Sequence, residues 1–127
     1  MFNFSLREVV PNIKTTLKYF NHTLDEFNYL LFHQANHLIN ETLRKMLKVD
    51  PAKVPYSLKE YGNTSCASIP LTMVTQLRAE LANKPQKILL SAFGIGLSWG
   101  TVLLETNKIV IPEITILKGK TEIEENA

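Results

Sequence analysis

The chain has 127 residues, of which 45% are apolar and 20% are charged, and its formal net charge is +2. This length and composition are typical of one folded domain, and they exclude a disordered tail, a collagen-like chain and a low-complexity linker. The basic excess, 14 basic against 12 acidic residues, is too small to predict nucleic-acid binding by itself. The one cysteine, Cys66, excludes an intrachain disulfide and favours a reducing compartment.

No targeting or membrane segment is evident. The first twenty residues carry charges throughout and lack the apolar core of a signal peptide. Glycines interrupt the longest apolar-rich stretch, residues 88–104, which argues against a membrane helix. We therefore expect a cytoplasmic chain that has no membrane partner.

The N-terminal segment combines two patterns. Phe2 and Phe4 alternate with polar neighbours, which predicts a short strand. Residues 5–8 (SLRE) form a capping-box pattern, and apolar residues then recur every three or four positions as far as Phe20, which predicts an amphipathic helix. Because Pro11 removes a backbone hydrogen bond past the first turn, this helix either begins later than the cap indicates or bends there.

The middle of the chain alternates between strands and helices. A second capping box at residues 23–26 predicts a short turn, and the continuous apolar run at residues 29–32 predicts a strand buried on both faces. A helix is expected from about residue 34 to residue 47. After a loop marked by prolines, we expect a short strand at residues 59–61 and a helix from about residue 66 to residue 81.

The last third of the chain predicts a β-hairpin. Residues 87–93 are expected to form a strand, residues 94–96 a tight turn and residues 97–104 the partner strand. Alternating isoleucines at residues 109–116 predict a last extended segment, and the acidic tail, residues 121–127, is expected to fray. The order strand, helix, strand, helix, helix, strand, strand predicts an α/β fold with a mixed β-sheet layered with α-helices.

Two histidines raise the question of a metal site. His33 and His37 are four residues apart, a spacing that can hold zinc when a glutamate follows the first histidine on a helix. Here Gln34 follows, and no third ligand is evident. We therefore expect no metal and no cofactor.

A glycine pattern follows the first hairpin strand. Gly94, Gly96 and Gly100 form GxGxxxG, whereas a dinucleotide-binding fingerprint requires GxGxxG at the start of a helix. Here the next residues are predicted to be a strand. The glycines therefore fit a hairpin or a close backbone approach better than a cofactor site.

Cys66 is a candidate nucleophile, because the start of a helix lowers the pKa of a thiol. However, the side chains of residues 65–68 are all small, which predicts a buried helix start where backbones approach closely. In such a place a cysteine is usually an inert packing residue, and we favour that interpretation.

A loose basic stretch lies in the middle of the chain. It allows two interpretations, a solvated face and a docking surface for an acidic partner, and the residues themselves favour neither. Its members are Arg44, Lys45, Lys48, Lys53 and Lys59.

His33 and Asn63 form the most informative pair. Each is predicted to follow a strand and to precede a helix, and in α/β folds such carboxyl-end positions collect catalytic groups. Both side chains can donate a hydrogen bond to one anionic oxygen. The alternative is that both residues only cap helices, and without further information this alternative is favoured.

Three ordered segments change that balance. Residues 33–36 (HQAN), 61–70 (YGNTSCASIP) and 93–100 (FGIGLSWG) resemble segments of the β-ketoacyl-acyl-carrier-protein synthase III family, in the same order. The resemblance covers residues 1–105 and implies the C-terminal half of a thiolase-like fold. Residues 106–127 extend beyond the usual ending of the family.

The resemblance implies a decarboxylative condensation of acyl-CoA with malonyl-acyl-carrier protein, the first step of fatty-acid synthesis. His33 and Asn63 are then the catalytic donors to the thioester oxygen, and the hairpin turn supplies the pocket and oxyanion backbone: Phe93, Gly94, Ile95 and Gly96. Contacts with the carrier protein and its pantetheine arm are implied for Gln34, Ala35, Asn36, Leu38, Arg44 and Lys45.

The family's nucleophilic cysteine lies in an N-terminal half that this sequence does not contain, and Cys66 occupies an alanine-type position. The resemblance therefore implies an acyltransferase fragment that is inactive alone, either truncated or the product of a split gene. Its implied partners are acyl-carrier protein, the N-terminal half and, in the full-length form, a second copy. A non-catalytic pairing or binding module and a secondary-metabolite synthase of the same fold remain alternatives.

Some positions depart from the family pattern. Leu38 stands where many relatives have a basic residue that contacts carrier protein, and Arg44 and Lys45 are the candidates to replace it. Ile95 is bulkier than the usual glycine or alanine, which predicts a tighter pocket. Ser98 replaces a common threonine, a mild change.

Overall fold

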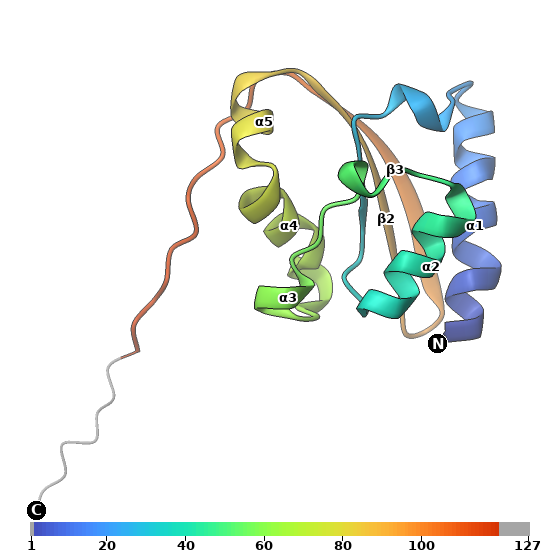
Figure 1. Cartoon of the computed structure of the whole chain (residues 1–127), viewed down its shortest axis with the longest axis horizontal. Helices are drawn as coiled ribbons and strands as arrows, with labels where there is room; N and C mark the ends of the chain where they lie inside the picture. Colours follow the sequence, from blue (N-terminus) through green and yellow to red (C-terminus); the bar gives the residue numbers. More distant parts are fainter. Residues whose placement is uncertain (1, 120–127) are drawn as a thin grey trace, which may run out of the picture.

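The computed structural model describes residues 2–119 of the chain (Figure 1). One strand lies between the first two long helices, and the other two strands follow the last helix. In chain order the elements are α1 (Phe2–Tyr19), η1 (Leu24–Glu26), β1 (Tyr29–Phe32), α2 (His37–Leu47), η2 (Pro51–Lys53), α3 (Leu58–Tyr61), η3 (Ser65–Ala67), α4 (Ser68–Gln76), α5 (Arg78–Asn83), β2 (Gln86–Gly94) and β3 (Ser98–Thr106).

The three strands form one mixed sheet in the order β1-β2-β3. β1 pairs with β2 in parallel, with Leu30 opposite Leu89, and β2 pairs with β3 antiparallel through the predicted hairpin. Helices α1 and α2 lie on one side of this sheet, and α4 and α5 lie on the other (Figure 1). The predicted α/β architecture with a mixed sheet is thus confirmed.

The buried strand β1 connects two hydrophobic clusters. Leu30 and Phe32 point into the larger cluster under α1 and α2, whereas Leu31 points into the smaller one under α4 and α5. All three side chains are completely buried, because alternate residues of a strand face opposite sides of the sheet. This explains the continuous apolar run, and the prediction of a strand buried on both faces is confirmed.

The prediction for the N-terminus is wrong in its first turn. Residues 2–4 are not a strand, and the cap at residues 5–8 does not start a helix, because α1 already begins at Phe2. Phe4 is buried in the larger cluster and packs edge-on against Trp99, with a centroid distance of 5.1 Å. Pro11 lies inside α1 on the exposed side, where water can replace the missing hydrogen bond.

Three further elements differ from the predictions. The segment predicted as a strand at residues 59–61 belongs to the short helix α3. The helix predicted from residue 34 begins only at His37, because Asn36 caps it by accepting a hydrogen bond from the Ile39 N–H at 2.9 Å. The helix expected at residues 66–81 is divided into η3, α4 and α5, with a break at Leu77.

The segment after β3 forms no strand within the described residues. It is tied down instead by its first residues, since the Ile109 N–H donates to the Leu81 carbonyl at 3.1 Å and Ile111 packs against the smaller cluster. The predicted fraying of residues 121–127 concerns positions outside the described residues. Within residues 2–119, none of the helices has the length and hydropathy needed to cross a membrane.

Candidate functional site

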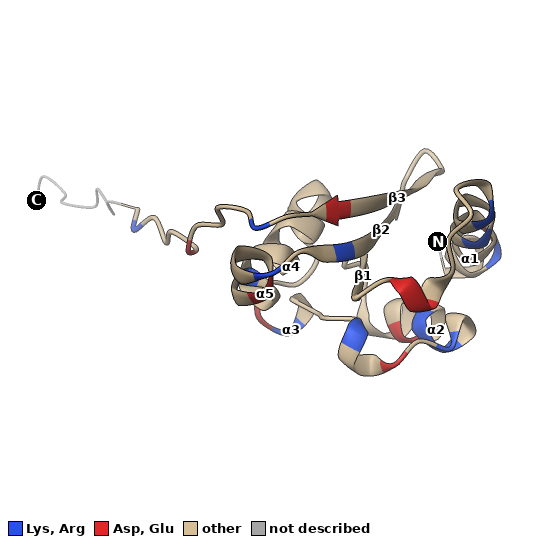
Figure 2. Ribbon diagram, turned by 90° about the horizontal axis from the view of Figure 1, so that it is seen from above, with Lys and Arg blue, Asp and Glu red and all other residues tan. Residues whose placement is uncertain are grey.

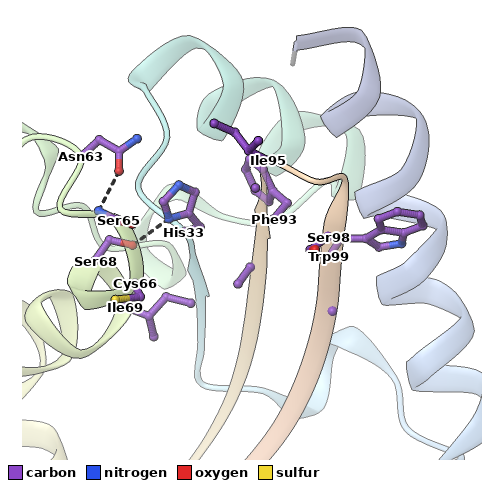
Figure 3. A pocket seen from close by; sticks show the side chains of 13 residues that line it. His33, Asn63, Ser65, Cys66, Ser68, Ile69, Phe93, Ile95, Ser98 and Trp99 are labelled. Atoms are coloured by element: carbon purple, nitrogen blue, oxygen red, sulfur yellow. Dashed lines mark hydrogen bonds between the residues drawn. The ribbon is translucent and has the colours of Figure 1, made fainter.

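An open cavity of about 850 Å³ lies where the ends of β1 and the β2–β3 hairpin meet the loop before α4 (Figure 3). His33 contributes from the end of β1. Asn63, Ser65 and Cys66 contribute from the loop and η3, and Ser68 from the start of α4. The hairpin closes the other side with residues 92–95 and 98–100.

His33 is held on all sides. Its backbone N–H donates to the Ser91 carbonyl at 2.8 Å, which continues the β1–β2 ladder, and its carbonyl accepts from Asn40 Nδ2 at 3.1 Å. The imidazole meets the Phe93 ring edge-on, with centroids 5.5 Å apart, and its Nδ1 lies 2.9 Å from Ser68 Oγ. The ring is therefore fixed at the cavity wall.

Burial keeps the imidazole neutral. Desolvation lowers the pKa of His33 below its ordinary value of 6.5, and a backbone hydrogen bond with Ser65 opposes this shift only in part. A neutral imidazole carries one N–H and can donate to an oxygen on which negative charge develops.

Asn63 lies between α3 and η3, where Gly62 ends α3 with a φ of +65°. Its Oδ1 accepts a hydrogen bond from the Ser65 N–H at 2.9 Å. Because a backbone N–H needs an acceptor, this contact orients the amide and leaves the two N–H groups of Nδ2 for other partners. The prediction that Asn63 follows a strand is wrong, since the preceding element is helical.

The structure brings His33 and Asn63 to the same cavity although they come from different elements. In Figure 3 the two side chains lie on the same wall, opposite Ile95. The arrangement presents a neutral imidazole and a carboxamide to one space. Two such donors can stabilise an oxyanion without supplying a charge.

Of the hairpin residues predicted to form the pocket backbone, Phe93, Gly94 and Ile95 line the cavity, whereas Gly96 does not. Phe93 is buried, whereas the Ile95 side chain at the turn is 91% exposed. Gly96 adopts a φ of +104°, which a residue with a Cβ rarely adopts, so glycine is required there for the turn. Gly94 ends β2 beside it.

The predicted burial of the helix start at residues 65–68 is wrong for three of its four positions. Ser65, Cys66 and Ala67 are exposed, and Ser68 alone is buried. Of η3 and α4, it is α4 that contacts β1, whereas Ser65 and Cys66 of η3 line the open cavity. The interpretation of Cys66 as a packing residue is therefore also wrong, because its thiol is free and exposed.

The residues expected to contact carrier protein and pantetheine have different environments. Gln34 is fully buried and bridges Phe32 and Ser57, because its Nε2 donates to the Phe32 carbonyl and its Oε1 accepts from the Ser57 N–H. Ala35 packs against the larger cluster, and Asn36 caps α2.

The remaining candidates for this contact lie on α2. Leu38 is 67% exposed, and Lys45 is exposed as well. Arg44 instead binds both carboxylate oxygens of Glu41, at 2.9 and 2.8 Å, and donates to the Val49 carbonyl. Figure 2 accordingly shows basic and acidic positions interspersed around α2.

The two histidines considered as a metal pair do not share a helix face. His33 precedes α2, whereas His37 is its first residue and packs edge-on against Tyr56. Within the part of the chain that the structure describes, no cluster of three His, Cys, Asp or Glu side chains suits a metal ion.

Sequence reasoning missed Ser68 and the contact between Phe93 and His33. Ser68 hydrogen-bonds His33 across 35 positions of the chain, and no local pattern indicates such a contact. The three short segments that carry the resemblance contain all three residues, and their order was the one available signal.

Solved structures identify the class of fold. The crystal structure of 3-oxoacyl-(acyl-carrier protein) synthase from Burkholderia xenovorans matches with a TM-score of 0.84 and 36% identity, covering 88% of this chain and 32% of that one. The synthase III from Pseudomonas aeruginosa matches with a TM-score of 0.78 and 30% identity, covering 86% and 34%. The fold is therefore that of the thiolase-like condensing enzymes.

The family follows from the sequence match. Residues 17–106 match the family described as 3-Oxoacyl-[acyl-carrier-protein (ACP)] synthase III C terminal, and the chain belongs to that family. It is 42% identical over 106 residues to the beta-ketoacyl-[acyl-carrier-protein] synthase III of Streptococcus gordonii, covering 82% of this chain and 33% of that protein. The chain thus spans about a third of the length of the curated relatives it matches.

Proposed function

We propose that this chain supplies the oxyanion-binding part of a 3-oxoacyl-acyl-carrier-protein synthase III, which condenses acyl-CoA with malonyl-acyl-carrier protein. One observation carries the proposal. The imidazole of His33 and the carboxamide of Asn63 line a single cavity, and the Ser65 N–H occupies Oδ1 of Asn63 rather than its Nδ2 donors.

The chemistry requires such a pair of donors. When a malonyl thioester loses CO₂, the electrons of the breaking carbon–carbon bond move onto the thioester oxygen and give an enolate. His33 and Asn63 donate to this oxygen as its charge grows, and each donor contributes about 10²–10³ in rate. Neither residue takes up or releases a proton, which agrees with the lowered pKa of His33.

The enolate carbon then attacks the carbonyl of an acyl group held on a cysteine thiolate, and that thiolate leaves as the new carbon–carbon bond forms. The backbone N–H of Ile95, at the hairpin turn, is proposed to bind the oxygen of this acyl group. Cys66 is not the acyl carrier, although it lines the same cavity as His33. It occupies a position of the family motif that normally holds alanine.

The nucleophilic cysteine belongs to an N-terminal half, so we propose that the 127-residue chain does not condense substrates alone. Its partners are that half, acyl-carrier protein and a second copy in the full-length form. Leu38 and Lys45, both exposed on α2, are the side chains best placed for the carrier protein. The free thiol of Cys66 fits a reducing cytoplasm.

The test uses a full-length synthase that carries this sequence as its C-terminal third. His33→Ala and Asn63→Ala are expected to lower malonyl decarboxylation by about 10²–10³ and to leave acyl loading of the cysteine largely intact. Decarboxylation is followed by release of labelled CO₂, and loading by mass spectrometry of the acyl-enzyme. Equal loss of both partial reactions contradicts the proposed roles.

The isolated chain provides a second test. With acyl-CoA and malonyl-acyl-carrier protein present together, no 3-oxoacyl product is expected. Product formed by the purified 127-residue chain contradicts the proposal that the acyl carrier lies elsewhere.

A further inference from the structure

Ser68 lies beside the imidazole of His33, and both residues line the cavity (Figure 3). It is the first residue of α4 and is 1% exposed. Its Oγ lies 2.9 Å from His33 Nδ1 and accepts the Gln34 N–H at 3.2 Å. One buried hydroxyl therefore contacts two consecutive residues at the end of β1.

The number of hydrogen bonds that this hydroxyl can donate and accept decides whether it donates to His33 Nδ1 or accepts from it. A serine hydroxyl has one hydrogen to donate and two lone pairs to accept with. The Gln34 N–H occupies a lone pair, and within the described residues the one acceptor that is hydrogen-bonded to the hydroxyl is His33 Nδ1. A buried hydroxyl that donates to no acceptor costs about 1–3 kcal/mol, so donation to Nδ1 is the satisfied arrangement.

We propose that Ser68 is a positioning residue that donates its hydroxyl hydrogen to His33 Nδ1 and thereby holds the imidazole in the tautomer protonated at Nε2. In that tautomer the Nε2–H is free to donate into the cavity, and the lone pair of Nδ1 accepts the hydrogen bond from Ser68. With the opposite tautomer, a lone pair faces the cavity and repels an oxyanion. The catalytic significance of this inference rests on the proposed function, whereas the tautomer is a property of the chain itself.

A buried polar network holds the hydroxyl in place. Thr72 Oγ1 donates to the Ser68 carbonyl at 2.8 Å and also contacts Ser57 Oγ at 2.8 Å. Ser57 in turn donates its N–H to Gln34 Oε1 at 3.0 Å. The network closes through the bond from Gln34 to Ser68, so α4, the loop before α3 and the end of β1 are joined next to His33.

The backbone of Ser65 competes with the Ser68 hydroxyl for a hydrogen bond with the His33 ring. It forms a hydrogen bond with the imidazole that raises the pKa of His33, against the larger lowering by burial. If that contact drew the ring proton to Nδ1, the hydroxyl of Ser68 would have to accept from the ring instead. The two arrangements differ in which ring nitrogen carries the proton, and this difference can be measured.

The test is nitrogen NMR of the 127-residue chain labelled at its histidines, at a pH well above 6.5, the ordinary pKa of the group. The protonated and unprotonated ring nitrogens resonate in separate ranges, and His33→Gln identifies the His33 signals by their loss. In the wild-type chain we expect the proton on Nε2. A proton mainly on Nδ1 in the wild-type chain overturns the proposal, whatever the variants do.

Variants then assign the effect to the hydroxyl. Ser68→Ala is expected to mix the two tautomers, and Ser68→Thr, which restores a hydroxyl, is expected to recover the Nε2–H form. Ser5→Ala is the matched control, because Ser5 is also completely buried but belongs to α1 on the other side of the sheet. An unchanged tautomer in a folded Ser68→Ala chain overturns the proposal.

Activity separates this inference from the proposed function. In the full-length synthase, Ser68→Ala is expected to slow malonyl decarboxylation less than the 10²–10³ of His33→Ala, roughly tenfold, because the imidazole remains and only its orientation is lost. If His33→Ala leaves decarboxylation intact, the proposed function fails and the tautomer result stands. If His33→Ala is inactive but Ser68→Ala is not slowed, the positioning role of Ser68 is contradicted and the proposed function is not.

Discussion

The carboxamide of Asn63 and the backbone of Ser65 form a closed local turn. Oδ1 of Asn63 accepts the Ser65 N–H at 2.9 Å, while Ser65 itself adopts a φ of +56°. A side-chain oxygen that accepts a backbone N–H two residues onward is a common way to stabilise such a turn. The oxygen is thereby occupied, and the amide nitrogen is the end that remains for a ligand.

Replacing Asn63 with aspartate separates these two functions. Asn63→Asp keeps an oxygen for the Ser65 N–H but removes both Nδ2 donors. Because Asn63 is exposed, the free energy of unfolding is expected to change by about 0.5 kcal/mol or less. Malonyl decarboxylation in the full-length synthase is expected to fall by about 10²–10³. Denaturant titration and CO₂ release measure the two effects, and a large loss of stability with little loss of rate contradicts the assignment.

The lowered pKa of His33 predicts that acid destabilises the fold. Because burial disfavours the charged imidazole, the folded chain takes up this proton less readily than the unfolded chain, whose pKa is near 6.5. The contribution of His33 is therefore fully present above 6.5 and is lost as the pH falls through the lower folded value. Urea titrations over this window should show a smaller pH dependence for His33→Gln than for the wild-type chain. If the stability of both chains falls equally with pH, the acid sensitivity does not come from His33.

Glu41 predicts a second acid transition at lower pH. Hydrogen bonds from Arg44, and a further one from Tyr56, lower the pKa of this carboxyl from 4.5 to about 2. The stabilisation is therefore complete above 4.5 and is lost as the pH falls through about 2. Glu41→Gln is expected to be less stable than the wild-type chain at neutral pH, and the difference should shrink across that interval. Glu60→Gln, which changes an exposed glutamate on α3, serves as the control.

The segment after β3 is expected to stabilise the fold through its first residues only. Ile109 and Ile111 are half-buried against the smaller cluster, and Arg78 Nε donates to the Ile111 carbonyl at 3.2 Å. A chain that ends at residue 107 is therefore expected to lose roughly 2 kcal/mol, since the burial of two isoleucines is lost. A chain that ends at residue 112 keeps these contacts and should match the full chain in thermal unfolding. Equal stability of both truncations contradicts this role.

Local patterns predicted the elements whose neighbours are close in the chain. The continuous apolar run at residues 29–32 predicted a buried strand, and the turn glycines between two apolar-rich segments predicted the hairpin found at residues 86–106. The first turn of α1 was missed because Phe4 is buried by Trp99, which comes from the other end of the chain. The residues 59–61 were mistaken for a strand because a helix of four residues is too short to show a period.

The sequence by itself determined the family and singled out His33 and Asn63 as the candidate donors, because three ordered motifs carry that information in residue types alone. The tertiary structure decided the rest: which face of His33 meets the cavity, which end of Asn63 is free, and that Cys66 is exposed. These properties depend on contacts between segments far apart in the chain, such as the one between Ser68 and His33. Hydrogen-bond direction and burial arise only when such segments meet, so no local pattern encodes them.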